Sequence, residues 1–83
     1  MEFNQKLFGQ RIQEARMTRG ITQEEFAEEI DVSPSYYQKL ERGVRTCSLD
    51  ILVSIAEHLH VSTDYLLTGK RSSTKEIKKA LME

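Results

Sequence analysis

The chain has 83 residues, of which 39% are hydrophobic and 30% are charged, and its formal net charge at pH 7 is −1. This length suits one domain with a small core, and this composition is typical of globular rather than disordered chains. The near-neutral charge disfavours a protein that binds nucleic acid through its overall charge, so any such binding must depend on the local distribution of charge.

The first third of the chain predicts two helices. The first covers about residues 4–18, where an apolar stripe at helical spacing is formed by Phe8, Ile12 and Ala15. The second begins after Thr22, because Thr22 and Glu25 match a capping box in which each side chain bonds the other residue's backbone N–H. Its inward residues are predicted to be Phe26, Ala27 and Ile30.

A third helix is predicted over residues 34–42. Ser33 is a favourable N-cap, Pro34 suits the first helical position, and Gly43 follows as a C-terminal cap. The connection between the second and third helices is about three residues long, which is typical of a helix-turn-helix.

Two more helices are predicted after a short loop over residues 44–47. Ser48 caps the fourth, over about residues 49–59, and Ser62 caps a short fifth helix that ends near Gly69. The inward residues are predicted to be Leu49, Leu52, Ile55, Ala56 and Leu59 on the fourth helix and Leu66 and Leu67 on the fifth. Residues 1–69 are therefore predicted to form one all-α domain of five helices.

The remaining residues, 70–83, form a basic tail with a net charge of +3. Residues 70–74 are expected to act as a hinge, and the spacing of Ile77 and Leu81 is compatible with one more helix that is too weakly apolar to be stable alone. Three interpretations stay open. The tail is disordered, it follows DNA through its charge, or it forms a helix that contacts a second copy or a protein partner.

Neither a membrane segment nor a secretion signal is predicted. No apolar run approaches the roughly 20 residues that a spanning helix needs, and residues 1–10 are too polar for a signal peptide. Cys47 is the only cysteine, so the chain forms no internal disulfide. These features predict a cytoplasmic protein without a membrane partner.

No catalytic or metal chemistry is predicted. His58 and His60 are too close in sequence to share one helix face, where metal ligands are usually about four residues apart. Cys47 has no histidine beside it in a catalytic motif. The glutamates of the second helix are expected to form a solvated face or, alternatively, a surface for a partner protein. We predict no enzyme activity, no metal and no cofactor.

Several motifs stand at characteristic distances between Gly9 and Gly69. They are Arg16, GITQEEFA over residues 20–27, VSPSYYQKLERG over residues 32–43, and SL, IA and VSTDYLL, which begin at residues 48, 55 and 61. Together they resemble the Cro/C1-type helix-turn-helix family, the phage-repressor and XRE-like transcriptional regulators. The resemblance implies a lambda-repressor-like fold in which the second and third helices form the DNA-binding unit. It also implies positive φ at Asp31 and His60, where the family often has glycine.

The resemblance places base contacts in the first part of the third helix. The candidates are Ser33, Pro34, Ser35, Tyr36, Gln38 and Lys39. Ser35, Lys39 and Arg42 share one helix face, and Lys39 can donate to O6 or N7 of guanine. Ser33 and Pro34 have a second interpretation, in which they only begin the helix. Pro34 also departs from family members that have glutamine or arginine at this position.

Phosphate contacts are predicted for Thr22, Gln23, Arg42 and Arg45. Gln23 lies in the first turn of the second helix, where its side chain and the free backbone N–H groups can bind a phosphate. Arg45 is alternatively a solvated charge of the loop. The resemblance further implies a partly buried ion pair between Arg16 and Glu41, which makes Glu41 a structural residue rather than a DNA contact.

These features predict a sequence-specific regulator that binds double-stranded DNA, a repressor that occupies a pseudo-palindromic operator as a homodimer. An alternative is an antitoxin-like module that sequesters a protein partner through its tail and regulates its own operon. A helical adaptor that never contacts DNA is a third hypothesis.

Overall fold

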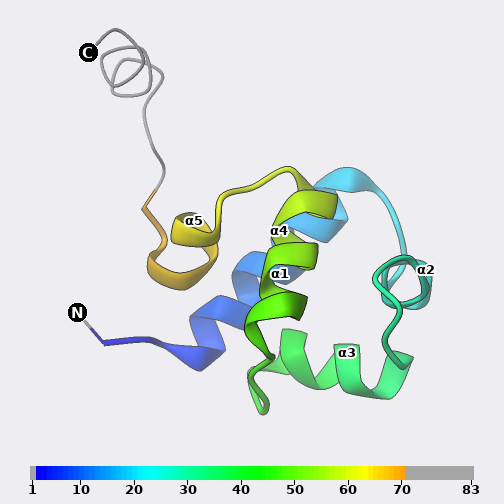
Figure 1. The fold of residues 1–83 in the computed structure, drawn as a ribbon, viewed down its shortest axis with the longest axis horizontal. Coiled ribbons are helices and arrows are strands. Elements are labelled where there is room, and N and C mark those ends of the chain that lie inside the picture. The colour runs from blue at the N-terminus through cyan, green and yellow to red at the C-terminus, as the bar shows by residue number, and fades with distance from the viewer. Residues whose placement is uncertain (1, 71–83) are drawn as a thin grey trace, which may run out of the picture.

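The computed structural model describes residues 2–70, which contain five helices and no strand. The helices are α1 (Gln5–Arg19), α2 (Gln23–Glu29), α3 (Pro34–Arg42), α4 (Leu49–Leu59) and α5 (Thr63–Thr68), as Figure 1 shows. The predicted all-α class and its five helices are confirmed. None of the described helices is long and apolar enough to cross a membrane. The predicted tail lies, from residue 71 onward, outside the described residues.

Each helix begins at a side-chain cap. The capping oxygens accept a hydrogen bond from the backbone N–H three residues later, at 2.9–3.3 Å, and belong to Asn4, Thr22, Ser33, Ser48 and Ser62. The positive φ expected at Asp31 and His60 is confirmed, with values of 59° and 58°. Both residues therefore hold a left-handed conformation that is strained for side chains with a Cβ.

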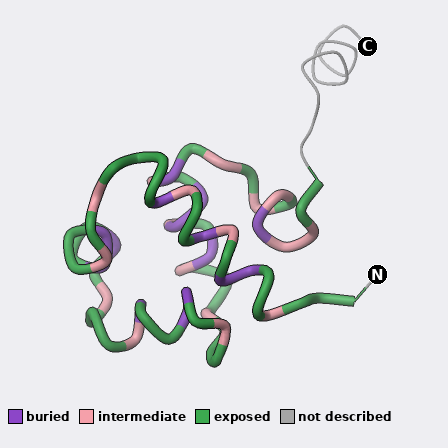
Figure 2. Tube along the Cα trace, turned by 180° about the vertical axis from the view of Figure 1, so that it is seen from behind, coloured by how far each residue is buried: buried purple, intermediate pink, exposed green. Residues whose placement is uncertain are grey.

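One hydrophobic core joins the helices, and Figure 2 shows its buried residues along the inner side of the chain. The side chains with no exposed surface belong to Ile12, Phe26, Ala27, Tyr37, Leu40, Ile55 and Leu66. The rings of Phe26 and Tyr37 meet edge to face with centroids 5.3 Å apart, which connects α2 to α3. The prediction for Leu49 is wrong: it is 78% exposed, because the first residue of α4 extends past the edge of the core.

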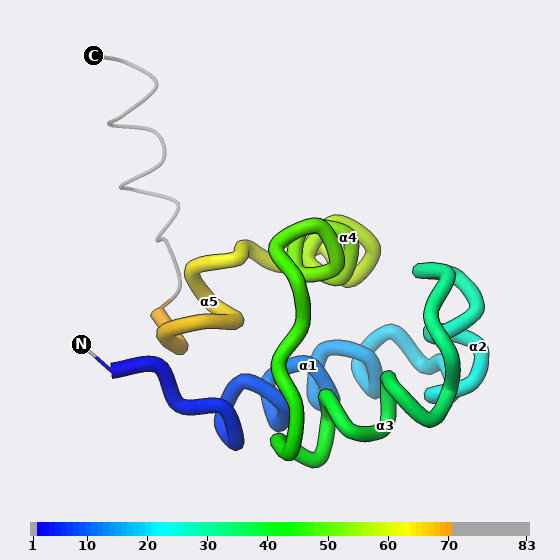
Figure 3. The backbone as a smooth tube through the Cα atoms, turned by 60° about the horizontal axis from the view of Figure 1, so that its bottom comes forward, coloured from blue at the N-terminus to red at the C-terminus, as the bar shows by residue number. Residues whose placement is uncertain are grey.

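Helix α1 is the centre of the fold, since it packs against α3, α4 and α5, whereas α2 packs against α3. Gly9 allows α1 and α3 to approach closely, because a Cβ at this position would overlap the carbonyl oxygens of Leu40 and Glu41. Figures 1 and 3 show that α5 and the N-terminal segment lie at one end of the domain and α2 at the other. Helix α3 is thereby held along the outside of the domain.

Candidate nucleic-acid interface

The two sides of α3 differ in burial and chemistry. The outer side carries exposed polar and cationic residues, which are Ser35, Gln38, Lys39 and Arg42, and the exposed Ser33 and Pro34 precede or begin the helix. The inner side is buried and consists of Tyr37, Leu40 and Glu41. Five of the base-contacting candidates and the phosphate-contacting candidate Arg42 are therefore accessible on α3 and its N-cap.

Tyr36 lies between these two sides and is half-buried. The guanidinium carbon of Arg45 lies 5.0 Å from the centroid of the Tyr36 ring, which is a cation–π contact. Loss of hydration on burial raises the pKa of the Tyr36 hydroxyl, so the ring stays neutral. The contact restrains the loop arginine beside α3, and it was not predicted from the sequence.

Arg16 of α1 and Glu41 of α3 form a buried ion pair. Arg16 Nε lies 2.6 Å from Glu41 Oε2 and Nη2 lies 3.2 Å from Oε1, and the two side chains are 10% and 1% exposed. The hydrogen bond and the charge of Glu41 raise the pKa of Arg16, while burial opposes this shift. Arg16 Nη1 also donates to the carbonyl of Ile21 at 2.7 Å, so one guanidinium connects α1, α3 and the segment that enters α2.

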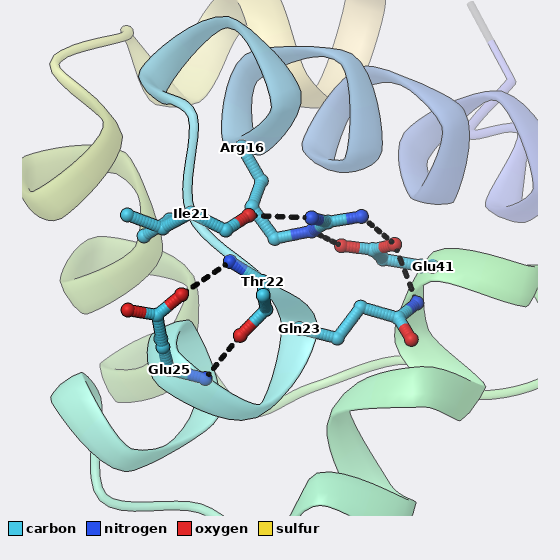
Figure 4. A network of polar contacts seen from close by, with 6 residues as sticks. All are labelled: Arg16, Ile21, Thr22, Gln23, Glu25 and Glu41. Atoms are coloured by element: carbon cyan, nitrogen blue, oxygen red, sulfur yellow. Dashed lines mark hydrogen bonds and ion pairs between the residues drawn. The ribbon is translucent and has the colours of Figure 1, made fainter.

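The first turn of α2 joins this network through Gln23 (Figure 4). Gln23 Nε2 donates to Glu41 Oε1 at 2.8 Å, and the side chain of Gln23 is half-buried. Thr22 and Glu25 form both bonds of the predicted capping box, each at 3.0 Å, and these bonds lower the pKa of Glu25. The Gln23–Glu41 contact puts the predicted phosphate ligand beside the C-terminal part of α3, where Lys39 and Arg42 are exposed.

A second ion pair, between Arg19 of α1 and Glu29 of α2, was not predicted from the sequence. The Arg19 guanidinium donates to both carboxylate oxygens of Glu29, to Oε1 at 2.8 Å, and the side chains are 35% and 30% exposed. His58 Nδ1 of α4 lies 3.2 Å from Glu29 Oε2. The hydrogen bond from Arg19 lowers the pKa of Glu29. These residues connect the C-terminal ends of α1, α2 and α4. They are not part of the exposed outer side of α3.

The described residues also bear on metal and thiol chemistry. Residues 2–70 hold no group of three or more side chains able to bind a metal ion. Cys47 is free and half-buried, and its burial raises the pKa of the thiol, which disfavours the reactive thiolate. His58 is engaged with Glu29, and His60 is the left-handed C-cap of α4.

The family and the relatives of the chain agree with this geometry. A family model described as helix-turn-helix matches residues 12–66. The HTH-type transcriptional regulator ImmR of Bacillus subtilis is 34% identical over 79 residues, which are 90% of this chain and 62% of ImmR. Control protein C.BamHI of Bacillus amyloliquefaciens is 37% identical over 62 residues, covering 74% of this chain and 76% of that protein. The chain thus spans less than two thirds of the length of ImmR.

A solved structure shares the fold as well. The restriction-modification controller protein C.AhdI from Aeromonas hydrophila superposes with a TM-score of 0.71 at 33% identity, covering 77% of this chain and 93% of C.AhdI. The names of these relatives describe regulators and controllers rather than enzymes, in agreement with the sequence analysis. The predicted resemblance is therefore confirmed, and the chain belongs to the Cro/C1-type helix-turn-helix family of transcriptional regulators.

Proposed function

We propose that the chain is a sequence-specific transcriptional regulator that inserts α3 into the major groove of double-stranded DNA. The observation that carries this proposal is the outer side of α3. Lys39 and Arg42 are exposed there, and within residues 2–70 neither has a carboxylate partner. Unpaired cations on a narrow helix suit the negatively charged major groove, which is about 12 Å wide.

The proposed contacts with DNA are of two kinds, to base edges and to phosphates. Lys39 donates to a guanine, while Ser35, Gln38 and the N-terminal residues Ser33 and Pro34 contact neighbouring base edges. Thr22, Gln23, Arg42 and Arg45 bind phosphates on either side and fix the position of α3 on the duplex. Tyr36 supports Arg45 through its ring and borders the base-contacting set.

We also propose that the chain is a cytoplasmic repressor and that it binds DNA as a homodimer. Two symmetric copies of α3 would lie about 34–36 Å apart, one turn of DNA, and would recognise a pseudo-palindromic site. Exposed apolar side chains in the N-terminal segment, the first turn of α1 and α4 support a second copy as partner, since exposed apolar patches commonly mark interfaces. They are Phe3, Leu7, Leu49 and Val53, with exposed fractions between 41% and 78%.

Selection of bound duplexes from a random pool, followed by footprinting of the selected sequence, tests the proposal. We expect one preferred sequence with two related half-sites. A footprint over a single half-site would contradict the homodimer. Loss of affinity should be steep as the salt concentration rises, because phosphate binding releases counterions. A chain that binds no duplex at low salt would contradict DNA binding altogether.

Substitution of Lys39 tests the assignment of base contacts. Lys39→Ala should lose about 1–3 kcal/mol of discrimination at one base pair while other positions keep their preference. Arg42→Ala is the comparison, because it removes one positive charge from the same exposed side of α3 at a predicted phosphate contact and should therefore weaken binding to all sequences alike. An equal loss of affinity for all sequences in the Lys39 variant would assign Lys39 to phosphate instead.

A further inference from the structure

Glu41 is buried directly behind the candidate phosphate ligand Gln23. Its carboxylate is 1% exposed and accepts three hydrogen bonds, two from Arg16 and one from Gln23. A carboxylate near DNA would repel phosphates, but the bound guanidinium of Arg16 neutralises this one. The carboxamide of Gln23 therefore contacts a pair of side chains without net charge.

The carboxylate also fixes which way the Gln23 carboxamide points. A carboxylate only accepts hydrogen bonds, so the amide nitrogen of Gln23, and not its oxygen, must face Glu41. One of the two N–H groups on that nitrogen is used by Glu41, and the other is directed away from the pair. Gln23 is only half-buried, so part of this residue reaches the surface.

The neighbouring bonds keep this arrangement in place. Arg16 holds Glu41 through two hydrogen bonds and the Ile21 carbonyl through a third, and Ile21 immediately precedes the cap of α2 (Figure 4). The position of Gln23 relative to α3 is thus set by the same guanidinium that orients its bonding partner. A phosphate ligand held in advance loses less side-chain freedom on binding.

We propose that Glu41 is a positioning residue for DNA binding: it orients the Gln23 carboxamide so that one N–H faces a phosphate. The inference rests on the proposed function, and it gives the buried ion pair a second role besides joining α1 to α3. Without Glu41 the amide is free to rotate and its oxygen can face the phosphate, where it is repelled.

A double-mutant cycle tests this coupling. The variants are Gln23→Met, the paired change Arg16→Met with Glu41→Met, and the combination of all three. The paired change is chosen because replacing both members of a buried ion pair by apolar side chains commonly keeps a protein folded. Circular dichroism and thermal melting verify folding, and Ile55→Val serves as a control that lowers stability in the core without touching the network.

Affinity is measured for a short duplex of random sequence, since a phosphate contact is independent of base identity. Gln23→Met should weaken binding roughly ten- to hundredfold, the effect of one hydrogen bond to a charged group. The paired change should weaken it similarly, and Gln23→Met should then have no further effect. Equal losses from Gln23→Met in both backgrounds would overturn the proposal.

Two further measurements separate orientation from a displaced helix. In the intact protein, one of the two side-chain N–H groups of Gln23 should exchange with solvent more slowly than the other because it is bonded to Glu41, and DNA should shift the resonance of the other one. In the protein with the paired change, Gln23→Lys should restore binding, because an ammonium group needs no orientation by a carboxylate. Equal exchange rates for the two N–H groups, or no restoration by lysine, would contradict the positioning role. Absence of binding by the unmodified chain would instead contradict the proposed function.

Discussion

Two ion pairs connect α1 to the helix-turn-helix, and they differ mainly in burial. Arg16 and Arg19 are three residues apart, and each donates two hydrogen bonds to one carboxylate. Arg16 and Glu41 are 10% and 1% exposed, whereas Arg19 and Glu29 are 35% and 30% exposed. Similar chemistry is therefore present in two different dielectric environments.

The difference shows what each pair contributes. Exposed ion pairs add little to the stability of a protein, because water and salt screen the charges and because long side chains lose conformational freedom when they pair. A buried ion pair also adds little stability compared with apolar residues at the same positions. Losing one member of the pair, however, leaves an unpaired charge in the interior. The Arg16–Glu41 pair is thus expected to enforce one arrangement of α1 and α3, and the Arg19–Glu29 pair to adjust it slightly.

Removal of one buried charge should have the largest effect. Glu41→Ala is expected to lower the free energy of unfolding by about 3–5 kcal/mol, because the guanidinium of Arg16 is left without a partner. Denaturant unfolding measures the loss. The paired change Arg16→Met with Glu41→Met should recover most of it, and an equally unstable double variant would mean that packing rather than charge is decisive.

High pH should weaken the buried region next. Burial raises the pKa of Tyr37, and the adjacent Glu41 raises it further. The folded pKa lies above the unfolded value of 10.0, so stability is complete below pH 10 and falls as the pH rises beyond it. The loss should be on the order of 1 kcal/mol at pH 11.

Tyr37→Phe isolates this contribution, because phenylalanine cannot ionise. The slope of stability against pH above pH 10 should be smaller in the variant than in the unmodified chain. Burial also raises the pKa of Cys47, which acts with the same sign, so both proteins must keep this cysteine. Identical slopes would show that Tyr37 does not ionise on unfolding.

The exposed pair should give the smallest effect and the opposite pH dependence. Arg19 lowers the pKa of Glu29, so the stability that Glu29 contributes is present above its unfolded value near 4.5 and is lost as the pH falls below it. Glu29→Gln should lower the melting temperature far less than Glu41→Ala does, and the change should vanish in high salt. A decrease as large as that of Glu41→Ala would contradict the importance of burial.

Local features of the structure could be predicted well from the sequence. Helix caps and helix ends depend on a few adjacent residues. The starts of α2, α3 and α4 were therefore predicted correctly from Thr22, Ser33 and Ser48. The positive φ at His60 was expected from the family resemblance, because the family often has glycine at this position. The prediction that Leu49 is buried was wrong, because helical spacing identifies a face of the helix but not how far the neighbouring helices extend along that face.

Contacts between distant residues were harder to predict. Gln23 and Glu41 are separated by 18 positions, and their hydrogen bond depends on how α2 crosses α3. The same holds for Arg45 over Tyr36 and for Arg19 with Glu29, which involve long side chains with many rotamers. The family resemblance thus implied the ion pair of Arg16 with Glu41, but the contacts of Gln23, Arg45 and Arg19 could not be predicted from the sequence.

Helix α3 uses separate residues for its two sides. Tyr37, Leu40 and Glu41 hold it to the protein, while Ser35, Gln38 and Lys39 make none of those contacts. Replacements of exposed side chains away from caps and ion pairs usually change stability by no more than about 0.5 kcal/mol. The outer residues can therefore be varied as a library on an unchanged scaffold, without changes to the interior.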